Sequence, residues 1–303
     1  MQSTLTIHIG NDRTYITAFE PTLKGLELMY INSIPERIGM DGDITELKHG
    51  LQAILPDIKG RFEKLRLCFP DENIFVHQFP AVKTGNIEEV KQLLGLEIRQ
   101  AYPQHSLEDY RSIVLPLLPK LDGKEMMIAM MIDQHQVHVG YVLSEILGLP
   151  CERMVVSQFS SHAALLYNYP EQIDNTVIVF GVHDRFADVS VLKKGSLAYY
   201  GLVPFNTKEE VGFAFEKEIE KLLASYIPFA DSAFLFGPGL TGSMLSSLST
   251  KLSVPTQRLN PFRMMTTNLS QSEREYCVKS AHLYPPNVGA ALPELQSAEM
   301  IKL

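Results

Sequence analysis

Leu5-Thr-Ile-His-Ile-Gly10 is an apolar run that ends in a glycine, and it is followed by Asn11-Asp-Arg13 and Thr14-Tyr-Ile-Thr-Ala-Phe19. The second half of the chain repeats this order in Thr176-Val-Ile-Val-Phe-Gly181, Asp184-Arg185 and Phe186-Ala-Asp-Val-Ser-Val191. In both places a Lys-Gly pair, another apolar run and a proline complete the pattern. An internal repeat of this kind is the first guide to the fold.

Each copy has the pattern of three short strands joined by two tight turns. Alternating apolar residues and β-branched side chains favour strands, while glycine, asparagine and aspartate favour the turns between them. Two copies of one meander predict two related lobes, each beginning with the same three strands. Chance similarity between two ordinary β-meanders is the alternative.

Between and after the copies, the periodicity predicts a mixture of helices and strands. Helical spacing of apolar residues predicts helices, whereas short apolar runs bounded by proline or glycine predict strands. Asp133 stands where a helix N-cap belongs. The predicted helices are 43–54, 87–102, 134–147, 208–226 and 243–252, and the predicted strands are 64–69, 73–79, 110–117, 124–132 and 232–236.

Composition limits the class of protein. The 303 residues are enough for two lobes, and the formal net charge of −8 argues against a general nucleic-acid binder. No run approaches the roughly 20 apolar residues that span a bilayer, and the first residues lack the pattern of a secretory signal. The three cysteines are widely separated and form no CxxC pair, which favours reduced thiols over a zinc site. We therefore expect a cytoplasmic protein without a structural metal.

Glycine turns after the two repeated strands, with a third in Phe236-Gly-Pro-Gly-Leu-Thr-Gly242, resemble the phosphate-1, phosphate-2 and adenosine motifs of the actin-like ATPase superfamily. Such turns let backbone N–H groups approach phosphates. Finer features resemble the PilM family of type IV pilus assembly proteins and its relative FtsA. They are Gly42-Asp-Ile44, Phe79-Pro80, Glu97-Ile-Arg-Gln-Ala-Tyr-Pro103, Asp109-Tyr110, Gly148-Leu-Pro150, Leu252-Ser-Val-Pro255, Asn260-Pro-Phe262 and Gly289-Ala-Ala-Leu292.

This resemblance covers the whole chain and implies an α/β fold of the two-lobed actin-like ATPase (ribonuclease H-like) type with an FtsA/PilM-type 1C insertion. Lobe 1A would hold residues 1–80 and 151–173 together with a C-terminal helix at about 281–295. The 1C-like insertion would hold residues 81–150. Lobe 2 would hold residues 174–280, with its outer part, 2B, at about 205–230.

The resemblance also implies a nucleotide site, which this sequence has partly lost. Gly10, Asn11, Gly181, Gly237 and Gly239 are the candidate nucleotide-site turns. Superfamily members place an aspartate two residues before each of the first two glycines, and the two carboxylates hold Mg²⁺. Here those positions are His8 and Val179. We therefore expect weak or absent binding of ATP or ADP, no Mg²⁺ without nucleotide, and no catalytic residue.

Other polar clusters have simpler interpretations. Asp12 and Asp184 fall in turns and are expected to form them. Asp133, His135 and His138 have a spacing that could hold a metal, but an N-cap followed by a solvated helix face explains them better. Ser160, Ser161 and His162 are neighbours along a helix and do not face one another as a catalytic pair would. The run from Met126 to Met131 fits a buried strand.

Three functional hypotheses follow. The first is a cytoplasmic, PilM-like scaffold recruited to the inner face of the membrane. By resemblance, it would bind the short cytoplasmic tail of a PilN-like bitopic membrane protein in a groove between lobe 1A and the helix 87–102. The second is an active actin-like ATPase or kinase, and the third is a nucleotide-free relic that binds some other protein. Oligomerisation, the organism and the identity of the partner stay open.

Overall fold

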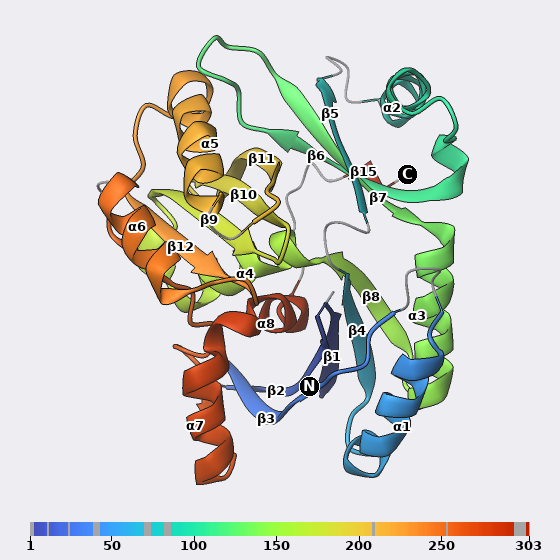
Figure 1. Cartoon of the computed structure of the whole chain (residues 1–303). Coiled ribbons are helices and arrows are strands. Elements are labelled where there is room, and N and C mark those ends of the chain that lie inside the picture. The colour runs from blue at the N-terminus through green and yellow to red at the C-terminus, as the bar shows by residue number, and fades with distance from the viewer. Residues whose placement is uncertain are drawn as a thin grey trace.

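The computed structural model describes residues 3–10, 12–23, 25–38, 43–69, 74–81, 86–207, 210–252, 254–293 and 301–302 (Figure 1). For residues 247, 251, 252, 301 and 302 it describes the backbone alone. Three β-sheets and the helices packed on them make up this part of the chain. Lys24, Gly42 and the candidate site residue Asn11 lie outside the described residues.

The first sheet has the strand order β14-β3-β2-β1-β4-β8. β1, β2 and β3 form an antiparallel meander, and β4 and β8 continue the sheet in parallel pairing. β1 lies between β2 and β4 and so has no free edge, and all six of its residues are buried. The bounds are β1 Thr4–Ile9, β2 Thr14–Thr22, β3 Gly25–Ile34, β4 Lys64–Phe69, β8 Cys151–Val156 and β14 Thr266–Thr267.

The second sheet repeats this topology with the order β11-β10-β9-β12-β13. Its first three strands form an antiparallel meander, and β12 and β13 are parallel additions. The bounds are β9 Thr176–Val182, β10 Phe186–Lys193, β11 Ser196–Pro204, β12 Ser232–Phe236 and β13 Thr256–Arg258. Because both meanders begin sheets of the same strand order, the two-lobed fold predicted from the repeat is confirmed.

The third sheet has the order β15-β6-β7-β5 and carries the helix α2, Ile87–Ala101, on one face. Its bounds are β5 Ile74–Pro80, β6 Tyr110–Leu117, β7 Met126–Asp133 and β15 Ile301–Lys302. This sheet was expected as an insertion beginning at residue 81. β5 pairs with β7 along seven residues, so the sheet takes in residues that were assigned to lobe 1A.

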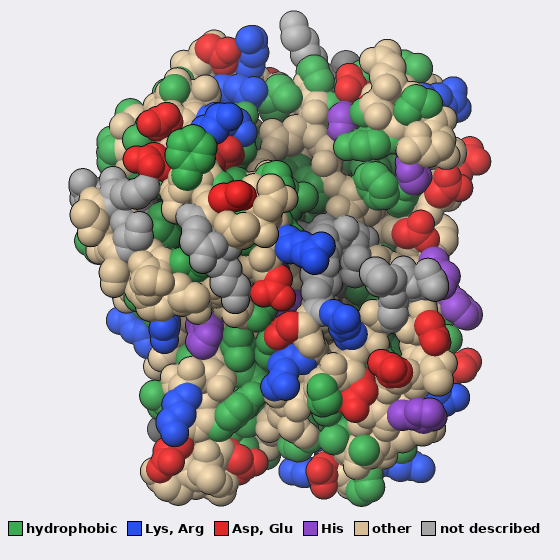
Figure 2. All heavy atoms as spheres, viewed as in Figure 1, with side chains coloured by type: hydrophobic (Ala, Val, Ile, Leu, Met, Phe, Trp, Pro, Cys, Tyr) green, Lys and Arg blue, Asp and Glu red, His purple; other side chains and the backbone are tan. Residues whose placement is uncertain are grey.

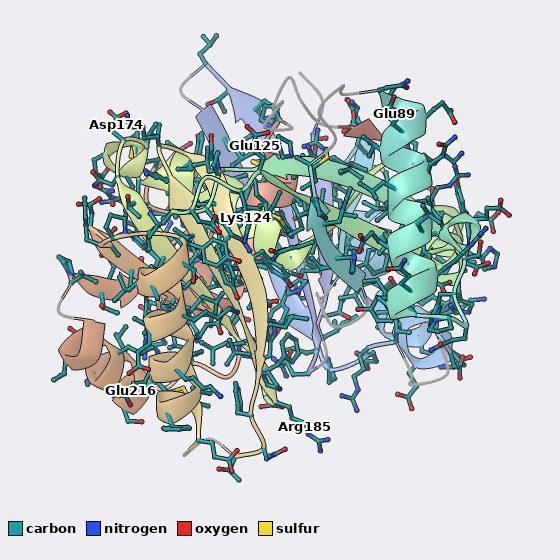
Figure 3. All side chains as sticks on the ribbon, turned by 90° about the horizontal axis from the view of Figure 1, so that it is seen from above. Glu89, Lys124, Glu125, Asp174, Arg185 and Glu216 are labelled. Carbon is teal, nitrogen blue, oxygen red and sulfur yellow. The ribbon has the colours of Figure 1, made fainter. Side chains whose placement is uncertain are left out.

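Alternation along β7 explains how this sheet is buried on both faces. Met127, Ala129 and Met131 pack with α2, whereas Ile128, Met130 and Ile132 contact the main body. The methionine-rich run is therefore a buried strand, as the sequence indicated. The connection between β6 and β7 reaches the second lobe, where Leu121 N–H donates to the Ser225 carbonyl at 3.1 Å; Figure 3 labels Lys124 and Glu125 in this connection.

The helices cover the sheets in two groups. α1 (Thr45–Ile58) and α3 (Gln134–Leu147) pack on the first sheet, and α4 (Ser157–Asn168) and α8 (Pro285–Ala291) pack together beside β1. α5 (Val211–Ser225) and α6 (Gly242–Leu252) cover the second sheet, and α7 is Gln271–Ser280. Short 3-10 turns are Leu107–Asp109, Pro170–Gln172 and Ala281–Leu283. The N-cap prediction for α3 is confirmed, since the Asp133 carboxylate accepts from His135 N–H at 2.6 Å.

Candidate functional site

The hairpin between β1 and β2 holds the first predicted nucleotide turn. Gly10 N–H donates to the Arg13 carbonyl at 3.0 Å and closes the hairpin. The Asp12 carboxylate accepts from the Tyr15 hydroxyl at 2.7 Å, and burial followed by the Asp12 charge raises the pKa of Tyr15 above its ordinary value. Asp12 therefore has a bond inside its own hairpin, as its turn-forming interpretation required.

His8 is buried in a network of its own. The Ser157 hydroxyl donates to the Phe69 carbonyl at 2.8 Å and lies 2.9 Å from Nε2 of His8. Because the serine proton is given to the carbonyl, Nε2–H of His8 donates to the serine oxygen. The imidazole also stacks on Tyr15, with 5.6 Å between ring centroids. Burial, and then the charge of His183, lowers the pKa of His8 from 6.5 to about 3, so the ring is neutral at pH 7.

The second hairpin corrects the placement of two predicted residues. In β1–β2 the last pair before the turn is Ile9 with Thr14, and in β9–β10 it is Val182 with Ala187. This register makes Gly181, not Val179, the counterpart of His8, and it places Gly181 inside β9. The turn itself begins at His183, whose N–H donates to the Phe186 carbonyl at 3.0 Å. Placing Gly181 in the turn and Val179 at the strand end was therefore wrong.

Val179 lies in the middle of the sheet. It pairs with Ser190 on one side and Phe234 on the other, and its side chain is fully buried. The cluster around it is apolar and includes Leu165, Tyr169 and Phe234. A carboxylate at this position would be surrounded by hydrocarbon, which disfavours its charged form.

Asp188 is a buried acid that the sequence analysis missed. It is paired with Gly181 across the hairpin and is 0% exposed. Its Oδ1 accepts from the Tyr200 hydroxyl at 2.8 Å, and its Oδ2 accepts from Nε2–H of His183 at 2.8 Å. A carboxylate in the apolar strand Phe186-Ala-Asp-Val-Ser-Val191 was the available signal. Both oxygens already hold protein donors, and the described residues contain no cluster of three acidic, histidine or cysteine side chains able to hold a metal.

The third predicted turn, after β12, is packed on the second hairpin. Gly237 has φ of +104°, which favours glycine, and its N–H donates to the His282 carbonyl at 2.8 Å. Gly239 N–H donates to the Val182 carbonyl at 2.9 Å, and Pro238 has no N–H. A Cβ on Gly239 would lie 2.2 Å from the His183 carbonyl oxygen. The glycines thus permit close packing of backbone on backbone, and their N–H groups are directed at protein carbonyls.

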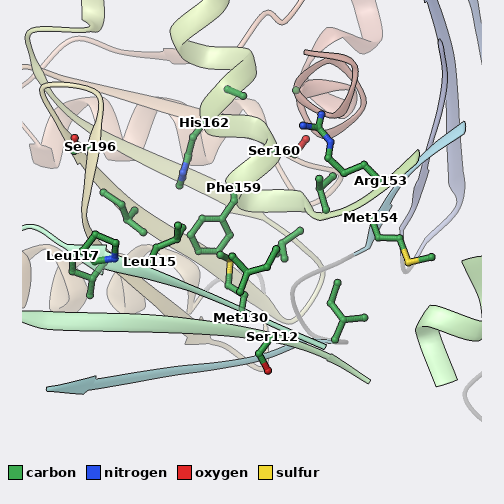
Figure 4. Close-up of a pocket in the computed structure, with 18 of the residues that line it drawn as sticks. Ser112, Leu115, Leu117, Met130, Arg153, Met154, Phe159, Ser160, His162 and Ser196 are labelled. Carbon is green, nitrogen blue, oxygen red and sulfur yellow. The ribbon is translucent and has the colours of Figure 1, made fainter. Parts of the chain in front are cut away.

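A cavity of about 1300 Å³ lies elsewhere, between the third sheet, β8, α4 and the turn from β10 to β11 (Figure 4). Apolar side chains dominate its lining, among them Leu115, Leu117, Met130, Met154 and Phe159. Pockets that bind ligands or peptide side chains commonly combine such a lining with a few polar groups. We call this cavity the sheet-edge pocket.

Polar side chains also line the sheet-edge pocket, among them His162 and Arg153. His162 of α4 is 5% exposed, burial lowers its pKa from 6.5 to about 3, and its Nε2 has no hydrogen-bond partner among the described residues. Arg153 of β8 donates to the carbonyls of Ala290 and Leu292 at 2.6 Å and so holds the end of α8. The neutral imidazole of His162 is thus one polar group of the lining that a ligand could bind.

The helix α2 does not line this pocket. Its buried residues Val90, Leu94 and Ile98 pack on the opposite face of the third sheet, and the pocket wall is formed by β6 and β7. The expectation that helix 87–102 forms one wall of a binding groove does not hold for this pocket. An amphipathic helix shows that one face is buried but does not show on which side of a sheet it packs.

The serines before His162 have structural roles. Ser160 Oγ donates to the Pro286 carbonyl at 2.7 Å, and Ser161 Oγ donates to the Ser157 carbonyl at 2.8 Å. Gly289 allows α8 to approach here, since a Cβ on it would lie 1.6 Å from the Ser160 carbonyl oxygen. The segment Ser160-Ser-His162 therefore joins two helices and forms no nucleophile–base pair.

Comparison with solved structures identifies the type of fold. No protein-family model and no curated protein matches the chain. Its fold is similar to that of a chain in the PilM–PilN type IV pilus biogenesis complex, with a TM-score of 0.77 and 15% identity, covering 96% of this chain and 99% of that one. A Bacteroides thetaiotaomicron protein of unknown function with an actin-like ATPase fold gives 0.54 at 12% identity, covering 96% of each chain.

The cytoplasmic domain of EpsL, an inner-membrane component of the Vibrio cholerae type II secretion system, gives a TM-score of 0.50 at 10% identity, covering 92% of this chain and 94% of that one. These similarities show an actin-like fold of the PilM type. Within the described part of the chain, every helix is too short or too polar to cross a bilayer.

Proposed function

We propose that the protein is a cytoplasmic, PilM-like scaffold in type IV pilus or related cell-envelope assembly, and that its sheet-edge pocket receives the short cytoplasmic tail of a PilN-like membrane partner. The observation that carries the proposal is the apolar cavity of about 1300 Å³ between the third sheet and the first lobe. The similarity in fold to a chain of the PilM–PilN complex supports it.

The pocket has the chemistry for an extended apolar peptide. Leu115, Met130 and Phe159 offer contacts to aliphatic side chains. Each leucine-sized side chain that is fully buried contributes about 1.5–3 kcal/mol. Micromolar affinity corresponds to about 8 kcal/mol, and association and ordering have a cost, so two or three such anchors need polar contacts beside them to reach it. Nε2 of His162 adds one hydrogen bond, which would orient a backbone group of the tail.

Weak or lost nucleotide binding is part of the same proposal. The neutral His8 is bonded to Ser157, and the N–H groups of Gly237 and Gly239 are bonded to backbone carbonyls. Mg²⁺ prefers carboxylate and phosphate oxygens; His8 supplies none, and Oδ2 of Asp12 is bonded to the Tyr15 hydroxyl. Charge distribution gives no sign of a nucleic-acid surface on the face in Figure 2, where Lys and Arg are scattered among Asp and Glu.

A pair of matched substitutions tests the tail-binding site. Leu115→Lys places a charge in the sheet-edge pocket, whereas Leu96→Lys places one on the outer side of α2, where Leu96 is 56% exposed. Fluorescent peptides copying the cytoplasmic tails of membrane proteins encoded beside this gene are titrated into both variants and the wild type. We expect Leu115→Lys to weaken binding at least tenfold and Leu96→Lys to leave it unchanged.

Two other outcomes would place the binding site elsewhere. Equal binding by both variants would exclude the pocket as the site, and weakening by Leu96→Lys alone would restore the groove beside α2.

ATP titration with and without Mg²⁺ tests the nucleotide part of the proposal. Magnesium-dependent phosphate release by the pure protein would favour the active ATPase or kinase instead.

A further inference from the structure

Among the described residues, the edge strand of the third sheet is covered over only part of its length. β6 has eight residues and pairs with β7 along all of them. On its other side β15 pairs with it at two positions, Ile301 with Val114 and Lys302 with Ile113. Figure 1 shows β15 beside this sheet, far in sequence from the strands that it joins.

The same edge belongs to the sheet-edge pocket. Arg111, Ile113 and Leu115 of β6 line the cavity, and so does Pro293, the last described residue before β15. Pro293 and β15 therefore both lie at the pocket, the first in its lining and the second on its edge strand.

An edge strand presents backbone N–H and C=O groups to any extended chain that reaches it. Such edges bind peptides by strand addition, in which main-chain bonds give affinity and alternate side chains fill neighbouring pockets. The segment already there ends in Met300-Ile-Lys-Leu303, three of whose four residues are apolar. A peptide of this chemistry suits an edge that borders an apolar cavity.

We propose that β6 is the docking strand of the sheet-edge pocket and that the chain's own segment 294–303 competes for this edge with the extended tail of a partner. The inference rests on the proposed function, since it assigns the tail a mode of binding. In the free protein β15 holds the edge, and only molecules in which β15 has left it present the whole strand. The apparent affinity for a tail is then reduced by the fraction of molecules with an open edge.

The test uses the segment itself as a probe. A fluorescent peptide of residues 294–303 is titrated into a protein that ends at Pro293, into the full chain, and into two full-chain variants. The Ile301→Pro/Lys302→Pro variant removes the strand's N–H donors, and the Ile301→Ala/Lys302→Ala variant keeps them. Circular dichroism melts establish that each version is folded. A scrambled peptide measures non-specific binding.

We expect the peptide to bind the shortened protein and the proline variant roughly tenfold more tightly than the full chain or the alanine variant, as the loss of a few backbone hydrogen bonds predicts. A partner tail is expected to show the same order and to compete with the peptide. Consecutive N–H groups of a strand point to opposite sides, so hydrogen exchange should be faster in the shortened protein at whichever of Ile113 and Val114 directs its N–H toward β15.

Three results would overturn the proposal in distinguishable ways. If a partner tail binds every version equally, the proposed function stands and competition by β15 is excluded. If the peptide binds the shortened protein but no partner tail binds any version, the proposed function fails, and the edge serves only the chain's own segment. Failure of the peptide to bind the shortened protein, with unchanged exchange at both Ile113 and Val114, would exclude β6 as a docking strand.

Discussion

The two hairpins and the sheet-edge pocket differ in the use made of their polar groups. At the hairpins, His8 is bonded to Ser157 and Asp188 to His183 and Tyr200. In the pocket, apolar side chains enclose about 1300 Å³, and Nε2 of His162 has no partner among the described residues. Polar groups bonded to the protein stabilise a fold, whereas an open apolar cavity can bind a ligand. From this comparison we propose that the hairpins serve structure and that the pocket serves recognition.

The largest expected effect comes from removing the buried acid of the second hairpin. Asp188→Ala leaves the Tyr200 hydroxyl and the His183 ring without their acceptor in a buried site. We expect the free energy of unfolding to fall by about 2–4 kcal/mol. Urea denaturation measures it, with Asp184→Ala in the exposed turn as control. If Asp188→Ala lowers the free energy of unfolding by less than about 0.5 kcal/mol, the structural role assigned to the second hairpin is wrong.

Packing of the third turn on the second hairpin predicts a smaller loss. Gly239→Ala forces a Cβ toward the His183 carbonyl oxygen, so we expect a destabilisation of about 1–3 kcal/mol. Gly95→Ala in α2 is the matched control, because a Cβ there meets nothing within 4 Å. It should stabilise the protein by about 0.5–1 kcal/mol through helix propensity. Thermal melts of both variants compare the two. If Gly239→Ala is tolerated, the turn is open enough to admit a ligand.

The smallest expected effect is the fall in the free energy of unfolding for each pH unit of acidification. Burial lowers the pKa values of His8 and His162 to about 3, from 6.5 in the unfolded chain. Between these values the unfolded state binds more protons, so stability falls as the pH is lowered through 6.5 toward 3 and is constant above. The slope is at most about 1.4 kcal/mol per pH unit for each histidine.

Urea midpoints at pH 7, 6 and 5 measure this slope. The His8→Gln/His162→Gln double variant should show a flatter profile than the wild type, whatever its absolute stability. His49→Gln, at an exposed position of α1, is the control. A double variant with the wild-type slope would show that neither imidazole is held neutral by burial.

Much of the fold could be predicted because its signals are local. The repeat of apolar alternation with glycine and aspartate turns predicted both meanders, and Asp133 predicted the start of α3. The hairpin register could not be read from Gly10 and Gly181, because pairing across the strands sets it and the second turn has no glycine. Contacts between segments that are distant in sequence likewise decide on which side of the sheet α2 packs.

The missed elements had weaker signals or none. β14 and β15 are two residues long and depend on neighbours far away in sequence. α7 had a readable start, since Ser270 and Glu273 form a capping box. Of the site residues, Asp188 was visible as a charge in an apolar strand. The sheet-edge pocket itself was not visible, because its lining comes from segments spread over most of the chain.

Hydrogen exchange of the full chain with a partner tail, and separately with ATP and Mg²⁺, tests the central claim most directly. The account predicts that the tail slows exchange in residues 110–117 and 157–163, which border the pocket, and leaves residues 4–10 and 176–190 unchanged. ATP with Mg²⁺ should protect neither region. Protection of the two hairpins by nucleotide, with no effect of the tail on β6 and α4, would contradict the account.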